Sequence, residues 1–181
     1  MGKILDDPKK VNFDLKVSDH RYWREKGLDL KQTAEFIEGK VGERFDVDRN
    51  KLGLESSRTV TEVRHGLLDV YAMVLGYSME CFLKALLVRK LLRGKSHHRF
   101  GEDNLFNKSK THDLCNLAIS VNFGLSERES KVLKHLEKCV VWAGRYPIPT
   151  SAIELSPRIW TEGDFEKARK LLQRLSSKNK N

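Results

Sequence analysis

The residues best suited to chemistry in this sequence are charged groups that stand in apolar surroundings. Glu80 and Lys84 lie four residues apart inside an apolar run, and Arg145 ends a later amphipathic segment. Buried charges are costly unless they are paired, so we expect the fold to bring some of these groups together. The i,i+4 spacing predicts a local pair between Glu80 and Lys84 on a helix. A bridge from Glu80 to Arg145 or His112 is the alternative, since a lone carboxylate there would become protonated.

His112 stands in a second segment with chemical potential, the run Thr111-His-Asp-Leu at a predicted helix start. A capping or surface role is one interpretation of this histidine. Proton transfer is the other, because imidazole changes its charge near neutral pH. Asp113 and Cys115 follow closely, but no second cluster of ligands accompanies them. The sequence therefore predicts no metal site and no cofactor.

The charge balance predicts attraction to polyanions. The chain has 181 residues, which fits one domain, and a net charge of +9. Positive charge gathers in residues 89–110 and in the C-terminal segment, with few acids beside it. Nucleic-acid contact is one explanation and solubility alone is the other. The predicted nucleic-acid-binding residues are Arg93, Lys95, Arg99, Lys84 and Tyr146. For Tyr146, base stacking competes with packing in a proline-flanked turn.

Cysteine usage and the termini predict a cytoplasmic protein. The three cysteines are isolated in apolar helical segments, which favours reduced thiols. The first residues lack the apolar core of a signal sequence. The apolar run over residues 67–92 is long enough to raise the question of a membrane span, but charged residues interrupt it. We expect a core helix there and no contact with a membrane.

The periodicity of apolar residues predicts an all-α fold. Helices are expected over residues 18–39, 59–93, 111–121 and 126–144, with a last helix that follows residue 161. Capping boxes, Thr59-Val-Thr-Glu and Ser126-Glu-Arg-Glu, mark the starts of two of these helices. These form an up-and-down bundle of four main helices plus a short one. Residues 39–57 read as a polar connection. Residues 1–17 are predicted to be an N-terminal extension, residues 18–176 the helical domain, and residues 177–181 a disordered basic tail.

The order of three motifs resembles the HEPN superfamily (higher eukaryotes and prokaryotes nucleotide-binding). These motifs are Gly76-Tyr-x-x-Glu-x-x-x-Lys, then Thr111-His-Asp-Leu, then Trp142-Ala-Gly-Arg-Tyr-Pro. The resemblance covers residues 18–176 and implies a helical bundle that is often a homodimer. It also implies a metal-independent ribonuclease or a regulatory or toxin-like relative. A cognate protein partner and a place in defence or a toxin–antitoxin pair follow from the same resemblance.

The nucleases of this family carry an Arg followed, after four to six residues, by a His. Arg145 stands where that Arg would be, but Thr150, Ser151 and Ala152 occupy the positions that should supply the His. The usual acid/base group is therefore missing. The same spacing recurs elsewhere in the chain about as often as chance allows. Of those matches, the pair Arg93 and His98 lies in the basic segment and is the alternative if the motif is displaced.

Two interpretations follow. In the first, the protein is a HEPN-like module that associates with RNA or a nucleotide. Its ribonuclease activity, if any, would use Arg145 to stabilise charge at phosphorus and His112 as the general base, beside Glu80. In the second, it is a non-enzymatic helical interaction protein whose polar centre only holds the bundle together. The missing His favours the second interpretation, and the positive charge favours the first.

Overall fold

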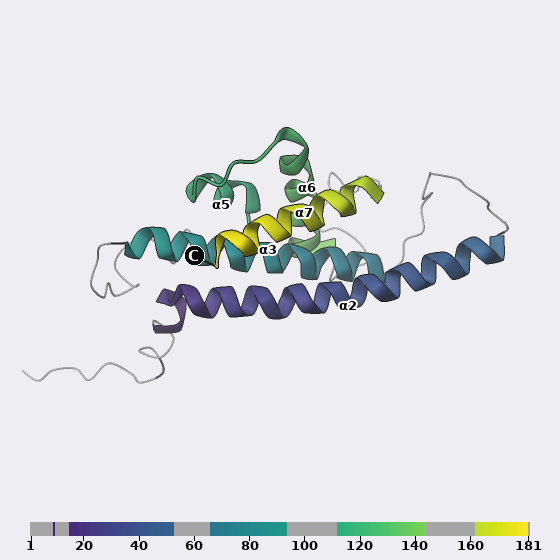
Figure 1. Ribbon diagram of the computed structural model, residues 1–181, viewed down its shortest axis with the longest axis horizontal. Coiled ribbons are helices and arrows are strands. Elements are labelled where there is room, and N and C mark those ends of the chain that lie inside the picture. The colour runs from purple at the N-terminus through teal and green to yellow at the C-terminus, as the bar shows by residue number, and fades with distance from the viewer. Residues whose placement is uncertain (1–8, 10–14, 53–65, 94–111, 144–161, 181) are drawn as a thin grey trace, which may run out of the picture.

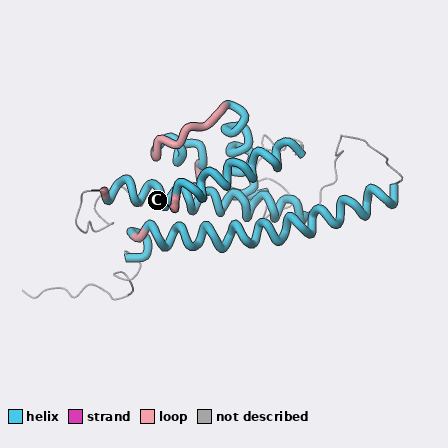
Figure 2. Tube along the Cα trace, viewed as in Figure 1, coloured by secondary structure: helices cyan, strands magenta, loops and turns pink. Residues whose placement is uncertain are grey.

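The computed structural model describes Lys9 and residues 15–52, 66–93, 112–143 and 162–180. All regular structure in these ranges is helical, and they contain no strand (Figure 2). The predicted all-α class is therefore confirmed. The predicted capping box at Thr59 and the basic segment from residue 94 to residue 110 lie outside the described residues.

Helix α3 (Gly66–Leu92) forms the centre of the molecule, as predicted. It contacts α2 (His20–Leu52), α5 (Leu114–Ser120), α6 (Glu127–Lys138), η1 (Cys139–Ala143) and α7 (Glu162–Lys178) (Figure 1). Apolar residues surround nearly its whole circumference, so side chains such as Phe82, Leu87 and Val88 are buried on different sides. By length and composition this helix could cross a membrane, but 83% of its most apolar window is buried within the protein. That burial is typical of the core helix of a soluble protein.

Helix α2 (His20–Leu52) runs antiparallel to α3 and extends beyond the other helices (Figure 1). The helix was predicted to end at Gly39, and residues 39–57 were predicted to form a polar connection. That prediction is wrong for residues 40–52, which are helical. The segment contains no proline, and each glycine in a helix costs only about 1 kcal/mol relative to alanine. Composition alone therefore did not break the helix.

The remaining helices pack on other sides of α3, with α5 and α6 on the side opposite α2 (Figure 1). They are the short α5 (Leu114–Ser120), α6 (Glu127–Lys138) with its π-helical continuation η1 (Cys139–Ala143), and α7 (Glu162–Lys178). The predicted capping box at the start of α6 is confirmed. Ser126 Oγ accepts from the Glu129 backbone N–H at 3.3 Å, and the Glu129 carboxylate accepts from the Ser126 N–H at 2.8 Å.

A close helix contact explains the glycine in the middle of α3. A Cβ built on Gly76 would lie 2.6 Å from Cγ2 of Val140 in η1 and 3.4 Å from the carbonyl oxygen of Leu136. Nearby, the Tyr77 hydroxyl donates to the Val140 carbonyl at 3.3 Å. Gly76 thus allows the π-helical turn to approach α3, which is the compensation expected for a mid-helix glycine.

The C-terminal residues are held more firmly than the sequence suggested. Ser177 and Lys178 belong to α7, and Asn179 is buried. The Asn179 side-chain amide donates to the Phe82 carbonyl at 3.2 Å and to the Leu175 carbonyl at 2.8 Å. These bonds satisfy carbonyl groups and fasten the end of α7 to α3, so residues 177–180 differ from the disordered tail that was predicted.

Candidate functional site

Glu80 and Lys84 form a buried ion pair on α3. Lys84 Nζ lies 2.5 Å from Glu80 Oε1, and only 6% of each side chain is exposed. The local i,i+4 pair predicted from the spacing is present. Because both charges are removed from water, each needs the other to offset the cost of burial.

His112 completes a three-residue network with this pair. Its Nδ1 lies 2.9 Å from Glu80 Oε2. One oxygen of the Glu80 carboxylate therefore contacts Lys84 and the other contacts His112. The bridge from Glu80 to His112 was one of the predicted alternatives, and the geometry confirms it. The other alternative, a bridge from Glu80 to Arg145, lies outside the described residues.

The start of α5 places the His112 ring over α3. Asp113 is the N-cap, and its carboxylate accepts from the Asn116 N–H at 2.8 Å. His112 therefore precedes the cap, and the buried Leu114 and Leu117 anchor the helix behind it. The sequence had left open a capping role for His112, but Asp113 fills that role.

Two aromatic rings border the network. Lys84 Nζ lies 5.2 Å from the centroid of the Trp23 ring, and Trp23 Nε1 donates to the Val17 carbonyl at 2.9 Å. On the other side, the Tyr77 ring meets the His112 ring edge-on, with 6.1 Å between their centroids. The network thus connects the N-terminal part of α2 with α3 and α5.

This arrangement is suited to proton transfer at His112. The buried Glu80 carboxylate fixes the ring orientation, while 42% of the His112 side chain remains exposed. When Nδ1 carries the proton it donates to Glu80, and Nε2 keeps the lone pair that can accept a proton. A cation at a reacting phosphate would also be needed for phosphodiester chemistry. Lys84 cannot act as this cation, because its buried ammonium group is paired with Glu80 and packs on the Trp23 ring.

The other predicted site residues are placed as follows. Arg93 is exposed at the turn that follows α3. Lys84 is buried, which differs from the exposed position that contact with a nucleic acid requires. Arg145, Tyr146, Lys95 and Arg99 lie outside the described residues. Within the described ranges, no group of three or more His, Cys, Asp and Glu side chains could hold a metal ion.

Beside the network, sequence reasoning missed a carboxylate that joins α5 to α6. The Cys115 backbone N–H donates to Glu137 Oε1 at 2.9 Å. Burial raises the pKa of Glu137, and the neighbouring Asp113 raises it further, against the opposing effect of the bond from Cys115. Burial also raises the pKa of the Cys115 thiol, to about 11, with Glu137 adding to the effect. A spacing of four residues predicts pairs within one helix, so it could not predict this contact between two helices.

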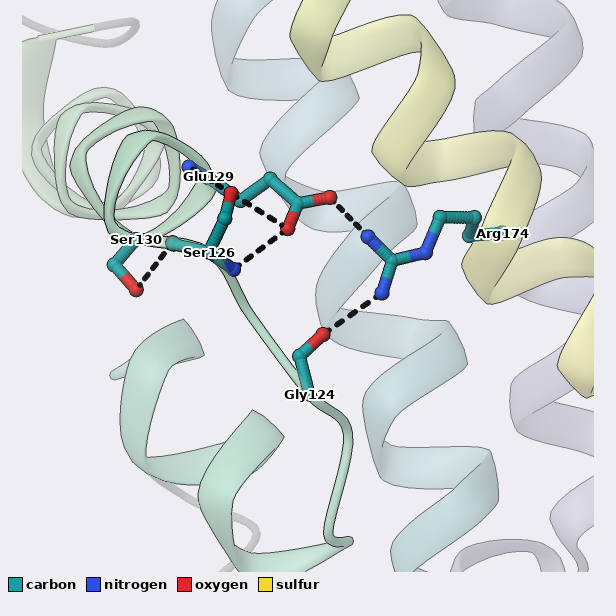
Figure 3. A network of polar contacts seen from close by, with 5 residues as sticks. All are labelled: Gly124, Ser126, Glu129, Ser130 and Arg174. Atoms are coloured by element: carbon teal, nitrogen blue, oxygen red, sulfur yellow. Dashed lines mark hydrogen bonds and ion pairs between the residues drawn. The ribbon is translucent and has the colours of Figure 1, made fainter.

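A second polar network joins α7 to the turn between α5 and α6 (Figure 3). One guanidinium nitrogen of Arg174 binds Glu129, and the other donates to the Gly124 carbonyl at 2.7 Å. Burial alone would raise the pKa of Glu129, but hydrogen bonds from Ser126 and Arg174 outweigh it and lower the pKa. The capping box was predicted from sequence, whereas its partner on α7 was not.

Comparison with known proteins adds no relative. No protein-family model, no curated protein and no solved structure matches this chain. The class that the structure defines is therefore an all-α bundle with a buried Glu80–Lys84 pair and a half-exposed His112.

Proposed function

We propose that this protein is a HEPN-like helical module that associates with nucleic acid, and that His112 faces the bound strand. The observation that supports the proposal most directly is the half-exposed His112 ring with its Nδ1 2.9 Å from the buried Glu80 carboxylate. An exposed imidazole oriented by a buried carboxylate can donate to a phosphate oxygen or exchange a proton with a ribose hydroxyl. The net charge of +9 favours a polyanionic ligand.

Cleavage is a separate part of this proposal. In the resemblance to HEPN nucleases, Arg145 would stabilise charge on the phosphate, and a His after it would act as acid or base. That His is absent from the sequence, and His112 is the group that could replace it. We expect binding without efficient cleavage, because the imidazole comes from the residue before the N-cap of α5 and not from the position that the family motif requires.

The test compares wild-type protein with His112→Asn on single-stranded RNA. The asparagine amide can still donate to Glu80, so the network is retained while the imidazole is lost. His20→Asn, a half-exposed histidine on α2, is the matched control. Binding is measured by fluorescence anisotropy at low salt and cleavage by gel electrophoresis. We expect His112→Asn to weaken binding several-fold and the control to leave it unchanged.

Three results are decisive. Wild-type protein that does not bind RNA at low salt would refute the proposal. Equal binding by wild type and His112→Asn would show that the His112 ring does not contact the bound strand. RNA cleavage by wild type that is lost in His112→Asn would extend the proposal to a ribonuclease.

A second candidate function is a non-enzymatic interaction protein with a structural polar centre. The observation that favours it is the burial of both Glu80 and Lys84, with the Lys84 ammonium packed on Trp23. These contacts fasten α2 to α3, and they need no ligand. Under this alternative, substitutions at Glu80 or His112 change stability and nothing else, so the RNA experiment separates the two functions.

The homodimer and the cognate protein partner belong to the same proposal, because they follow from the family resemblance. The cytoplasmic location is proposed from the three isolated cysteines, which favour reduced thiols. Sedimentation at several protein concentrations tests the dimer. A mass of one chain at every concentration would refute it.

A further inference from the structure

A basic hollow lies where the second half of α7 faces the turn between α5 and α6. Its volume is about 610 Å³, which is within the range of small-ligand pockets. Among the described residues its lining includes three cations and no carboxylate, and polar side chains that can form hydrogen bonds stand between them. The lining residues are Phe123, Gly124, Lys170, Gln173, Arg174, Ser177 and Lys178.

The three cations form a row along one face of α7. Lys170, Arg174 and Lys178 follow each other at intervals of four residues. At 1.5 Å per residue, the row is about 12 Å long. A row of this length fits an extended anion with several charges better than a single small ion.

The floor of the hollow is already ordered. The Arg174 guanidinium lies 4.9 Å from the centroid of the Phe123 ring, and its bonds to Glu129 and Gly124 hold it there (Figure 3). Lys178 Nζ lies 5.3 Å from the same ring. Groups that are held in place before binding lose less conformational entropy when the ligand arrives.

Acidic neighbours neutralise only part of this charge. Glu129 pairs with Arg174, and Glu166 pairs with Lys170 at 2.6 Å. In the part of the chain that the structure describes, no carboxylate lies within salt-bridge distance of Lys178. Arg89 adds a further cation near this end, because its guanidinium donates to the Lys178 carbonyl at 3.1 Å. The hollow therefore keeps an excess of positive charge.

The geometry points to a binding site for a phosphate chain, meaning consecutive phosphate groups of a nucleic-acid strand or of an inorganic polyphosphate. Lys178 and Lys170 would contact phosphate oxygens, and Gln173 and Ser177 would donate hydrogen bonds to them. This site is formed by α7 and the turn at Gly124, and it includes none of the residues of the Glu80–His112 network. For a nucleic-acid strand the inference rests on the proposed function, whereas for inorganic polyphosphate it does not.

Gly124 allows a test that leaves every cation in place. A Cβ at this position would meet nothing within 4 Å, so a longer side chain can be added at the mouth of the hollow. Gly124→Glu introduces a negative charge there, and Gly124→Gln is the neutral variant of the same size. Gly39→Glu adds the same charge on α2, where a Cβ also meets nothing within 4 Å. Circular dichroism before each titration establishes that the variants are folded.

Two ligands serve as probes. Binding of tripolyphosphate is measured by titration calorimetry, and binding of single-stranded RNA by fluorescence anisotropy. We expect Gly124→Glu to weaken tripolyphosphate binding about tenfold, since one unfavourable charge pair near a surface is worth a kcal/mol or more. Gly124→Gln and Gly39→Glu should change it much less. Lys178→Gln should weaken binding as well, with Lys131→Gln, another exposed lysine, as its control.

The outcomes separate this inference from the proposed function. Absence of tripolyphosphate binding at low salt, or equal binding by Gly124→Glu and Gly124→Gln, would overturn the inference even if RNA binds elsewhere. Loss of both ligands in Gly124→Glu would support a nucleic-acid strand in the hollow. Loss of tripolyphosphate alone, with RNA binding unchanged or absent in wild type, would support a site for free polyphosphate.

Discussion

Removing Glu80 should destabilise the protein more than any other single change in the polar network. Glu80→Leu leaves the Lys84 ammonium buried beside the Trp23 ring, without its carboxylate partner. Loss of one partner of a buried ion pair costs about 3–5 kcal/mol, because the remaining charge has lost its compensation. The total stability of a domain is about 5–15 kcal/mol. The variant should therefore fold, but with much of its stability lost.

Removing Lys84 should cost less. In Lys84→Met the Glu80 carboxylate keeps its contact with His112 at 2.9 Å, and the half-exposed ring gives it a path to solvent. Methionine also retains most of the apolar volume of the lysine stem. The double variant, Glu80→Leu with Lys84→Met, buries no charge and should be close to wild type in stability. The coupling energy between the two positions should thus be about 3 kcal/mol or more.

Urea unfolding followed by circular dichroism measures all four proteins of this cycle. Glu127 and Lys131 on α6 supply the control, because they have the same spacing and a 2.7 Å contact but are mostly exposed. Their coupling should be about 0.3–0.5 kcal/mol. If the Glu80–Lys84 coupling were as small as that of the exposed pair, the argument from burial would be refuted.

Three further predictions concern packing, pH and thiol reactivity. Gly76→Ala should lower the midpoint of thermal unfolding because the added Cβ would meet Val140, whereas Gly39→Ala, which has open space around it, should raise the midpoint. A higher midpoint for both variants would contradict the close contact at Gly76. Because the folded protein raises the pKa of Glu137, that group contributes stability below about pH 4 and loses it as pH rises through the folded pKa. In Glu137→Gln the free energy of unfolding should therefore decline less steeply above about pH 4. An unchanged pH profile would contradict the raised pKa of Glu137. With its pKa raised to about 11, Cys115 should react slowly with iodoacetamide at pH 8 until urea unfolds the protein, and rapid native labelling would exclude the geometry described.

Features that depend on neighbours along the chain could be predicted from the sequence. The apolar surface of residues 67–92 on all sides indicated a central helix, and α3 has that position. The Ser126 capping box and the Glu80–Lys84 pair followed from spacings of three and four residues. The extent of α2 could not be predicted in this way. Its polar, glycine-containing C-terminal part has the composition of a connection, but weak local propensities do not exclude a helix.

Contacts between segments that are distant in the chain were decided by the tertiary structure. The position of His112 on Glu80, the bond from Arg174 to the Gly124 carbonyl, and the burial of Asn179 against Phe82 depend on how the helices are rotated and offset when they pack. The sequence by itself determined the helical class, the central helix and the groups that needed partners, because these follow from periodicity and from the cost of burying charge. Only the packed bundle decided which partner each group received.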